Sequence, residues 1–159
     1  MACGPVADRG LTDVACPLCT AVGGALVFQA QQFRVIRADE AGFPAFYRVV
    51  WSAHVAEFSD LALAERNLCM AAVTVVEQVL REQLHPTKVN LAALGNVVPH
   101  LHWHVIARFD WDSHFPLPVW CQAQRPVDAR AVEAIRGRLE AVDRLVQRSL
   151  ADFVIPSDL

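Results

Sequence analysis

The chain has 159 residues, a formal net charge of −3 at pH 7 and 54% hydrophobic residues. This length suits one domain with a sizeable core, and the mild negative charge argues against a nucleic-acid-binding surface, which needs clustered Lys and Arg. No apolar run approaches the roughly 20 residues that span a membrane, and the first residues lack a signal-peptide pattern. We therefore expect a cytoplasmic protein without a membrane partner, with part of its apolar surplus buried in an oligomer interface.

The beginning of the chain offers a possible pair of metal ligands. Residues 1–13 are small and polar, which predicts a loose tail. Cys16 and Cys19 follow, with the spacing of a zinc ligand pair, although a redox dithiol or coincidence would give the same pattern. A redox dithiol would be expected among βαβ units, which the next segments do not suggest. Besides His102 and His104, the histidines that could complete a zinc site are His54, His85, His100 and His114.

Three strands are predicted next. Residues 25–30 and 33–38 form two short apolar runs around a two-residue turn, which predicts a hairpin. Residues 39–44 contain Gly and Pro and are expected to form a loop. Residues 45–52 are aromatic and β-branched, which favours a third strand.

A long helix is predicted from Ser59 to about Leu84, because the apolar period changes there to between three and four. Ser59 suits the N-cap, and His85 should end the helix because it precedes a proline. The helix should cover the apolar face of the sheet. The expected apolar stripe consists of Leu61, Ala64, Leu68, Ala71, Val75 and Val79. Residues 88–94 predict a fourth strand, which a turn at Gly95 and Asn96 connects to a fifth.

The fifth strand carries the strongest functional signal. Residues 99–109 hold three of the six histidines at alternate positions between large apolar residues. This alternation predicts a half-buried strand with His100, His102 and His104 on one face, and Leu101, Trp103, Val105, Ala107 and Phe109 toward the core. The first and third of these histidines should lie roughly 13 Å apart, so the three can hardly share one metal ion. We therefore expect the row to serve two sites.

The last third of the chain predicts a long loop and a helix. Residues 110–127 contain Trp111, His114, Trp120 and three prolines. Loops of this length are uncommon and often functional, so this one could line the site or a subunit interface, or be a surface loop held by its tryptophans. Asp128 should cap a final helix. The apolar stripe expected for that helix is Val132, Ile135, Leu139, Val142, Leu145 and Val146.

The histidine row is also recognisable. Residues 100–106 resemble the His-φ-His-φ-His-φ-φ signature (φ, apolar) of the histidine triad (HIT) family of nucleotide hydrolases and transferases, and all seven positions match. The flanking residues 95–99 and 107–109 resemble bacterial HIT proteins of the diadenosine-tetraphosphate-hydrolase-like kind. The resemblance implies an α+β, HIT-like fold with a five-stranded antiparallel sheet, covered on one face by a long helix and followed by an additional C-terminal helix. The expected HIT domain spans residues 14–110, with residues 111–159 packed on it.

The resemblance also assigns catalytic and metal-binding roles. His102 would attack the α-phosphorus of a nucleoside phosphoanhydride or phosphoramidate and form a covalent nucleotidyl-histidine, as in nucleophilic catalysis generally. His104 would contact the phosphate and assist proton transfer, and no catalytic cofactor is required. A structural zinc ion would be held by Cys16, Cys19, His54 and His100. The expected ligand is a purine nucleotide or a dinucleoside polyphosphate, and the expected assembly is a homodimer.

Three further residues are candidate substrate contacts. The resemblance places Asp39 on the ribose hydroxyls, although a solvated turn would also explain this residue. Asn90 and Asn96 would hydrogen-bond the phosphates or the leaving group, whereas an Asn beside Gly can simply form a turn. The chain departs from the family where some members carry a histidine, at Phe46, and where many carry a hydroxyl residue, at Val97. Phosphate contacts at Val97 are therefore expected from backbone N–H groups.

Two other functions remain open from the sequence. One is a zinc-dependent hydrolase in which His102, His104 and a remote histidine hold a metal ion with an open coordination position. The other is a nucleotide-binding or sensor module without catalysis.

Overall fold

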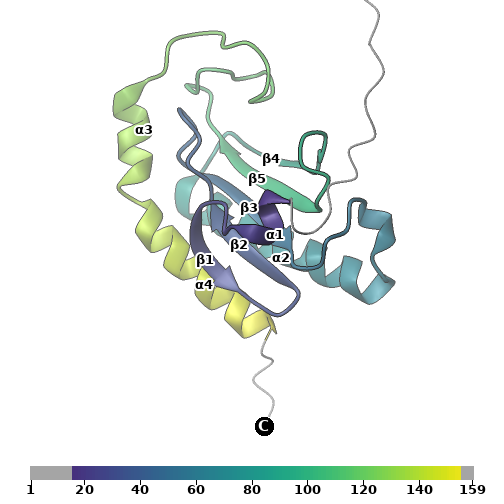
Figure 1. The fold of residues 1–159 in the computed structure, drawn as a ribbon. Helices are drawn as coiled ribbons and strands as arrows, with labels where there is room; N and C mark the ends of the chain where they lie inside the picture. Colours follow the sequence, from purple (N-terminus) through teal and green to yellow (C-terminus); the bar gives the residue numbers. More distant parts are fainter. Residues whose placement is uncertain (1–15, 155–159) are drawn as a thin grey trace, which may run out of the picture.

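A computed structural model of the protein describes residues 16–154 (Figure 1). The elements in chain order are α1 (Pro17–Thr20), β1 (Ala25–Gln29), β2 (Phe33–Arg37), β3 (Phe46–Trp51), the 3₁₀ helix η1 (Phe58–Asp60), α2 (Leu63–Leu84), β4 (Lys88–Ala92), β5 (His102–Arg108), α3 (Ala129–Arg136) and α4 (Leu139–Val154). The predicted tail, residues 1–13, lies outside the described residues. Between residues 16 and 154, no helix is both long enough and apolar enough to cross a membrane.

The five strands form one antiparallel sheet in the order β1-β2-β3-β5-β4, which confirms the predicted fold class. The strand β5, which carries His102 and His104, therefore lies between β3 and β4. The predicted ends of two strands were wrong: β4 stops at Ala92, and β5 starts at His102, so His100 precedes the strand. A loop over residues 93–101 separates them, and Gly95 has the positive φ of +68° that glycine adopts without strain.

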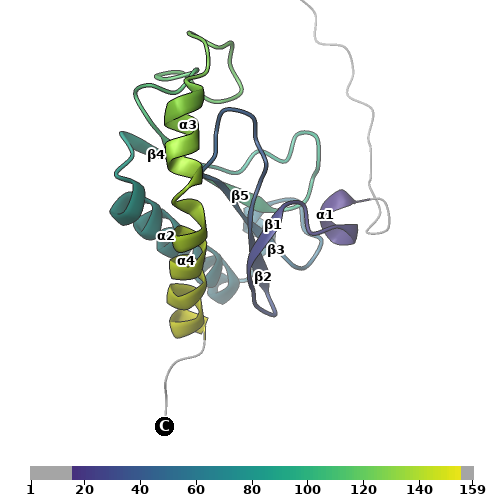
Figure 2. The ribbon, with the colours of Figure 1, turned by 90° about the vertical axis from the view of Figure 1, so that its left-hand side faces the viewer.

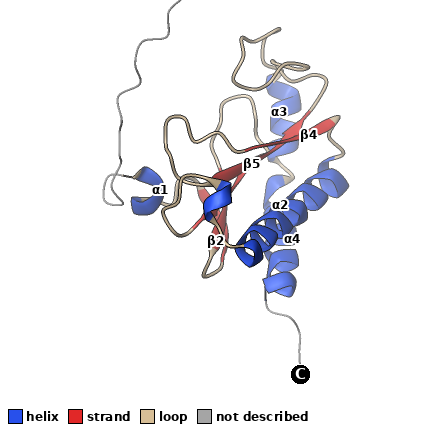
Figure 3. Cartoon of the chain, turned by 90° about the vertical axis from the view of Figure 1, so that its right-hand side faces the viewer, coloured by secondary structure: helices blue, strands red, loops and turns tan. Residues whose placement is uncertain are grey.

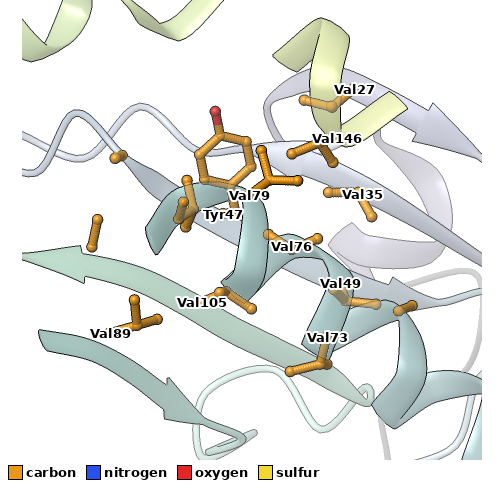
Figure 4. Packing of buried hydrophobic residues seen from close by; sticks show 14 of the residues in the cluster. Val27, Val35, Tyr47, Val49, Val73, Val76, Val79, Val89, Val105 and Val146 are labelled. Carbon is orange, nitrogen blue, oxygen red and sulfur yellow. The ribbon is translucent and has the colours of Figure 1, made fainter. Parts of the chain in front are cut away.

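One face of the sheet packs against α2 and α4 (Figures 2 and 3). Figure 4 shows how valines from the sheet, α2 and α4 meet there. Val35, Val49 and Val105 are fully buried, and burying each such side chain stabilises the fold by roughly 1.5 to 3 kcal/mol. The predicted core positions of the histidine strand are confirmed: Leu101, Val105, Ala107 and Phe109 are buried in this cluster, and Trp103 packs against it.

The long helix α2 is confirmed, but its start was predicted wrongly and its buried stripe was predicted only in part. Of the predicted stripe, Leu61 and Val79 are buried, and Leu68 and Val75 are partly buried against the core. Ser59 lies in η1, and α2 begins at Leu63, where the Glu65 carboxylate accepts a hydrogen bond from the Ala62 N–H at 2.8 Å. The buried residues of α2 are Cys69, Ala72, Val73, Val76, Val79, Leu80 and Leu84. Alanine and valine recur around much of this helix, so the apolar period did not identify the face that packs on the sheet. The helix ends at His85 as predicted, in the left-handed conformation with φ 49°.

The C-terminal segment forms two helices instead of one, because the chain breaks between α3 and α4 at Gly137 and Arg138. Asp128 caps α3 as predicted, since its Oδ1 accepts a hydrogen bond from the Ala131 N–H at 2.9 Å. In α4, Asp143 accepts hydrogen bonds from the Tyr47 hydroxyl at 2.6 Å and from Arg37 at 2.9 Å. The predicted apolar positions Val132, Ile135, Leu139, Val142 and Val146 are buried, and Leu145 is half-buried.

Candidate functional site

The short helix α1 lies on the face of the sheet opposite α2 and α4 (Figures 2 and 3). Arg34 of β2 donates a hydrogen bond to the Leu18 carbonyl at 2.7 Å and so ties α1 to the sheet. On this side a hollow of about 650 Å³ opens, within the range of about 300 to 1,000 Å³ that is usual for small-molecule sites. Its lining residues are Pro17, Leu18, Ala21, Gly23, Arg48, Leu94, Gly95, Asn96, Val97, Val98, His102, His104 and Trp120.

His102 has a defined tautomer in this hollow. Its Nδ1 lies 2.7 Å from the backbone oxygen of His100. A carbonyl oxygen can only accept, so Nδ1 carries the proton and Nε2 keeps its lone pair. Burial lowers the pKa of His102, and the nearby positive charge of Arg48 lowers it further. The ring is therefore neutral at physiological pH, with one nitrogen available as a base or nucleophile.

His104 is a buried neutral imidazole surrounded by rings. Burial, followed by repulsion from Arg48 and from His102 when that ring is protonated, lowers the pKa of His104 to about 3. Its ring centroid lies 4.8 Å from that of His102, 5.4 Å from Phe46 and 5.3 Å from Trp120. Phe46 thus supports His104 by edge-on packing. Within the described residues, His104 Nδ1 has no hydrogen-bond partner.

Arg48 is a site residue that the sequence reasoning missed. It is the direct antiparallel partner of His104 in the pairing of β3 with β5, so the two side chains share one face of the sheet. Its Nη2 donates to Glu40 Oε1 at 2.6 Å, and its guanidinium carbon lies 5.3 Å from the centre of the Phe46 ring. The available signal was a charged residue inside an otherwise apolar strand.

Trp120 also reaches the hollow, from the long loop over residues 110–127. A buried ion pair anchors this loop: Arg108 Nε donates to Asp112 at 2.7 Å, and Arg108 Nη2 donates to the Leu117 carbonyl at 2.9 Å. Asp112 in turn accepts from the Phe115 N–H at 2.7 Å. The sequence left open whether this loop lines the site, lines a subunit interface or lies on the surface. Trp120 lies against His104, so part of the loop lines the hollow.

The three predicted substrate contacts lie in different places. Asn96 lines the hollow beside His102 and His104. Asn90 lies on the same face of the sheet, but its Oδ1 accepts a hydrogen bond from Arg108 Nη1 at 2.7 Å, and it lines a neighbouring hollow. Asp39 is exposed and lines a third hollow with Arg37. The structure therefore brings only Asn96 of these three together with the histidines.

The four predicted metal ligands, Cys16, Cys19, His54 and His100, do come together. Their ligand atoms all lie within 4.8 Å of one another. His100 Nδ1 lies 3.5 Å from Cys16 Sγ, 3.4 Å from Cys19 Sγ and 3.3 Å from His54 Nδ1. A tetrahedral zinc ion with its usual bond lengths would separate sulfur from nitrogen by about 3.6 Å and nitrogen from nitrogen by about 3.3 Å. The donor set and its spacing therefore fit zinc.

His100 connects this group to the hollow. Its Nε2 lies 2.7 Å from the Trp51 carbonyl oxygen and must donate to it, which leaves the lone pair of Nδ1 facing the other three ligands. Its own carbonyl accepts the Nδ1 proton of His102. The other two candidate metal ligands, His85 and His114, lie elsewhere. His85 ends α2, and His114 packs on Phe43 with ring centroids 5.1 Å apart.

Solved structures with this fold include several bacterial histidine triad proteins. The histidine triad protein blr8122 from Bradyrhizobium japonicum has a TM-score of 0.61 and 29% identity, covering 76% of this chain and 90% of that chain. A histidine triad protein from Marinobacter aquaeolei has a TM-score of 0.62 and 21% identity, covering 79% and 92%. A Zn-bound histidine triad family protein from Mycobacterium smegmatis has a TM-score of 0.56 and 18% identity, covering 83% and 98%. No curated protein sequence matches the chain.

The family model described as HIT domain matches residues 22–111, which is more than half of the 159 residues. The matched segment includes all five strands, the helix α2 and the histidine row. The chain therefore belongs to the HIT, or histidine triad, family.

Proposed function

We propose that this HIT protein cleaves a nucleoside phosphoanhydride or phosphoramidate at the α-phosphate, through a covalent bond between the nucleotidyl group and His102. Family membership supports nucleotide binding or hydrolysis in general. The observation that carries the finer proposal is the state of His102: the His100 carbonyl fixes its tautomer, and its ring is neutral beside a hollow of nucleotide size.

The reaction has two displacements, which divides one difficult step into two easier ones. In the first, the lone pair of His102 Nε2 attacks the α-phosphorus, and an N–P bond forms while the bond to the leaving phosphate or amine breaks. The leaving group departs with the bonding pair and takes a proton from water. In the second, water attacks the phosphorus, the N–P bond breaks, and its electron pair returns to Nε2 while the proton of the water passes to solvent. The product is a nucleoside monophosphate.

The neighbours of His102 would hold the phosphate during both steps. His104 can donate a hydrogen bond from a ring nitrogen to a phosphate oxygen, and the amide of Asn96 can donate another. Val97 has no hydroxyl to offer, so backbone N–H groups near Gly95 would supplement these contacts. The predicted roles of Asp39 at the ribose and of Asn90 at the leaving group stay predictions, because neither residue lines this hollow.

The substrates that best fit the proposal are purine nucleotides in diadenosine polyphosphates or AMP-amine conjugates, as in the bacterial diadenosine-tetraphosphate-hydrolase-like HIT proteins. The mainly apolar wall formed by Leu18, Val98 and Trp120 suits a flat base. The choice between the two substrate classes depends on the leaving group, so a panel that contains both is the appropriate assay.

We also propose that Cys16, Cys19, His54 and His100 hold a structural zinc ion. A bound ion would cross-link α1 to the segments that follow β3 and precede β5, and so brace one wall of the hollow. The Zn-bound histidine triad family protein from Mycobacterium smegmatis, which has the same fold, supports this proposal. The zinc-hydrolase alternative is less well supported, because the group of candidate ligands found among residues 16–154 includes neither His102 nor His104.

The zinc proposal is tested by metal analysis of the purified protein. One zinc ion per chain is expected for the wild type, and Cys19→Ser should lose it and lower the melting temperature. Cys121→Ser is the matched control, because Cys121 is exposed and lies outside the group of four ligands. A wild-type protein that purifies and refolds in zinc without binding the ion would contradict the proposal.

The expected homodimer is a proposal as well. β4 is an edge strand of the sheet, and it presents exposed Leu91, with exposed Leu94 shortly after it. An apolar sheet edge is a ready surface for pairing with a second chain. Light scattering should give twice the chain mass. A cytoplasmic location, the absence of nucleic-acid and membrane partners, and the domain boundaries at residues 14 and 110 stay predictions from the sequence.

A substrate panel with three proteins tests the catalytic proposal. Wild type should release AMP from an adenosine phosphoramidate or a diadenosine polyphosphate, and His102→Ala should lose at least about a thousandfold in rate. His85→Asn is the matched control, because His85 lies at the end of α2 in a left-handed conformation that Asn tolerates. Wild-type rates in His102→Ala would contradict the proposal. AMP binding without any turnover by wild type would instead identify a non-catalytic nucleotide-binding module.

A further inference from the structure

We propose that Arg48 supplies the positive charge that binds the substrate phosphate in the hollow, and that Glu40 positions Arg48 for this contact. The inference deepens the proposed function and rests on it for the identity of the ligand, a nucleotide. It concerns a residue outside the histidine row, on the neighbouring strand β3.

The placement of Arg48 is the first argument. Arg48 pairs directly with His104 across β3 and β5, and Val50, two residues further along β3, pairs with His102. Directly opposed residues have Cβ atoms only about 4.5 to 5.5 Å apart. Arg48 therefore stands beside both histidines, on the face of the sheet where the hollow lies, and it is one of the lining residues.

The charge balance of the hollow is the second argument. The polar residues of its lining are Arg48, Asn96, His102 and His104. Among these lining residues, Arg48 is the one with a permanent positive charge, since a guanidinium stays protonated in proteins. A nucleotide phosphate carries at least one negative charge, and an anion in a largely apolar site is costly unless it is paired. Arg48 is the group positioned to make that pair.

The donors of Arg48 are the third argument. Glu40 accepts from Nη2 at 2.6 Å, and Phe46 packs against the guanidinium. These two contacts hold the group from two sides but use few of its five N–H donors. Its Nε is buried and, within the part of the chain that the structure describes, has no hydrogen-bond partner. A phosphate oxygen would satisfy this donor, and guanidinium groups bind phosphate through two parallel hydrogen bonds.

Glu40 differs from Arg48 in exposure. The side chain of Glu40 is 41% exposed, whereas that of Arg48 is 21% exposed. Water therefore solvates the carboxylate more than the guanidinium and weakens its attraction for Arg48, so the ion pair orients Arg48 and leaves its other N–H donors for a ligand. The pair also limits the rotamers of a long side chain, which lowers the entropy lost when a ligand binds. Glu40 is thus a positioning residue, and Arg48 is the residue that touches the phosphate.

The comparison of AMP with adenosine tests this inference, because the two ligands differ only in the phosphate. Dissociation constants are measured by calorimetry at one ionic strength for wild type, Arg48→Gln, Arg48→Lys, Glu40→Gln and Arg144→Gln. Arg48→Gln should weaken AMP binding by about tenfold or more and change adenosine binding by less than about twofold. Arg48→Lys should lose less AMP affinity than Arg48→Gln, since it keeps the charge without the planar donors. Glu40→Gln should also lose less AMP affinity than Arg48→Gln.

Arg144→Gln is the control for net charge, because Arg144 is exposed on α4 and pairs with Glu140 four residues away. It should leave both affinities unchanged. An AMP-to-adenosine affinity ratio in Arg48→Gln equal to that of wild type would overturn the inference. If Arg48→Gln does not fold, the same ratio in Arg48→Lys decides: a severalfold loss supports the role of the guanidinium, and an unchanged ratio overturns it.

Binding and turnover separate this inference from the catalytic proposal. A loss of AMP preference in Arg48→Gln together with unimpaired hydrolysis by His102→Ala would uphold Arg48 and refute the covalent mechanism. A trapped nucleotidyl-His102 together with an unchanged AMP-to-adenosine ratio would do the reverse. A wild type that binds AMP no better than adenosine would overturn the role of Arg48 whatever its hydrolytic activity.

Discussion

The two faces of the sheet are made by the same strands but have opposite properties. On the face toward α2 and α4, β3 contributes Tyr47, Val49 and Trp51 to a dry core. On the other face, the intervening Arg48 of β3 and the histidines of β5 border the hollow. Because successive side chains of a strand point to opposite faces, a residue that stabilises the core can be the direct neighbour of a residue that lines the hollow. We refer to these as the core face and the histidine face.

The histidine face is not simply a solvent surface. His104 and Arg108 are buried on it, and Phe46 and Ile106 form a small apolar cluster. Two of its polar groups are held by specific partners: Asp112 pairs with Arg108, and the His100 carbonyl accepts from His102. Changes on this face should therefore alter both stability and ligand binding, whereas changes on the core face should alter stability alone.

The largest expected effect on stability is that of Asp112→Ala, on the histidine face. Asp112 and Arg108 have side chains only 2% exposed, so the variant leaves a buried charge without its partner. The expected loss is about 3 to 5 kcal/mol in the free energy of unfolding. AMP binding should also weaken, because the loop that places Trp120 in the hollow is no longer anchored. Urea unfolding and calorimetry measure both quantities. Asp110→Ala removes an exposed carboxylate of the same loop and should cost little. A loss below about 1 kcal/mol in Asp112→Ala would refute this role.

On the core face, Leu80→Ala should cost about 2 to 5 kcal/mol, because it opens a cavity under α2 where Leu80 is fully buried. Its AMP affinity per folded molecule should equal that of wild type, which is the contrast with Asp112→Ala. Leu63→Ala, at an exposed position of the same helix, is the control and should change the stability little. A Leu80→Ala protein of normal stability, or one with much weaker AMP binding, would break the proposed separation of the two faces.

The third prediction uses the pKa of His104, which is lowered from 6.5 to about 3 in the folded protein. Between these values the unfolded chain binds a proton that the folded protein does not. The free energy of unfolding should therefore fall as the pH falls below about 6.5, by at most about 1.4 kcal/mol per pH unit from this group. His104→Gln removes this contribution, so its stability should depend less steeply on pH between 6 and 4. Equal slopes in urea titrations of the two proteins would contradict the burial of a neutral His104.

The smallest effect is expected for Asp128→Ala, away from both faces. The variant removes the hydrogen bond from the Ala131 N–H that caps α3, which should cost about 1 kcal/mol. Asp128→Asn keeps an acceptor at the same place and should stay within a few tenths of a kcal/mol of wild type. AMP binding should not change in either protein. A change in AMP binding would show that α3 communicates with the hollow.

The sequence predicted most of the fold because local patterns determine it. The alternation in residues 99–109 identified the core side of β5 correctly, and His85 before a proline marked the end of α2. The errors occurred where tertiary packing decides. The buried stripe of α2 depends on which of several apolar faces meets the sheet.

The site was predictable to the extent that it is encoded in short motifs. The four metal-ligand candidates came together as expected. The spacing of Cys16 and Cys19 indicated one pair of ligands, and the family resemblance supplied His54 and His100. Arg48 was not found as a site residue, since it reaches the histidines through the pairing of two strands that are distant in sequence. Trp120 was named only as part of a loop that could line the site, and the sequence did not show which of the loop's residues would reach the histidines. Asn90 was interpreted as a ligand contact, whereas its amide oxygen is bonded to Arg108.

The most direct test of the account is to look for the covalent intermediate on His102. Wild-type protein is mixed with an adenosine phosphoramidate, denatured at alkaline pH within the first turnover, and analysed by intact-protein and peptide mass spectrometry. The account predicts a transient protein species that carries one adenylyl group on the peptide containing His102, and no such species in His102→Ala. Turnover by wild type without this species, or with the adenylyl group on another residue, would contradict it.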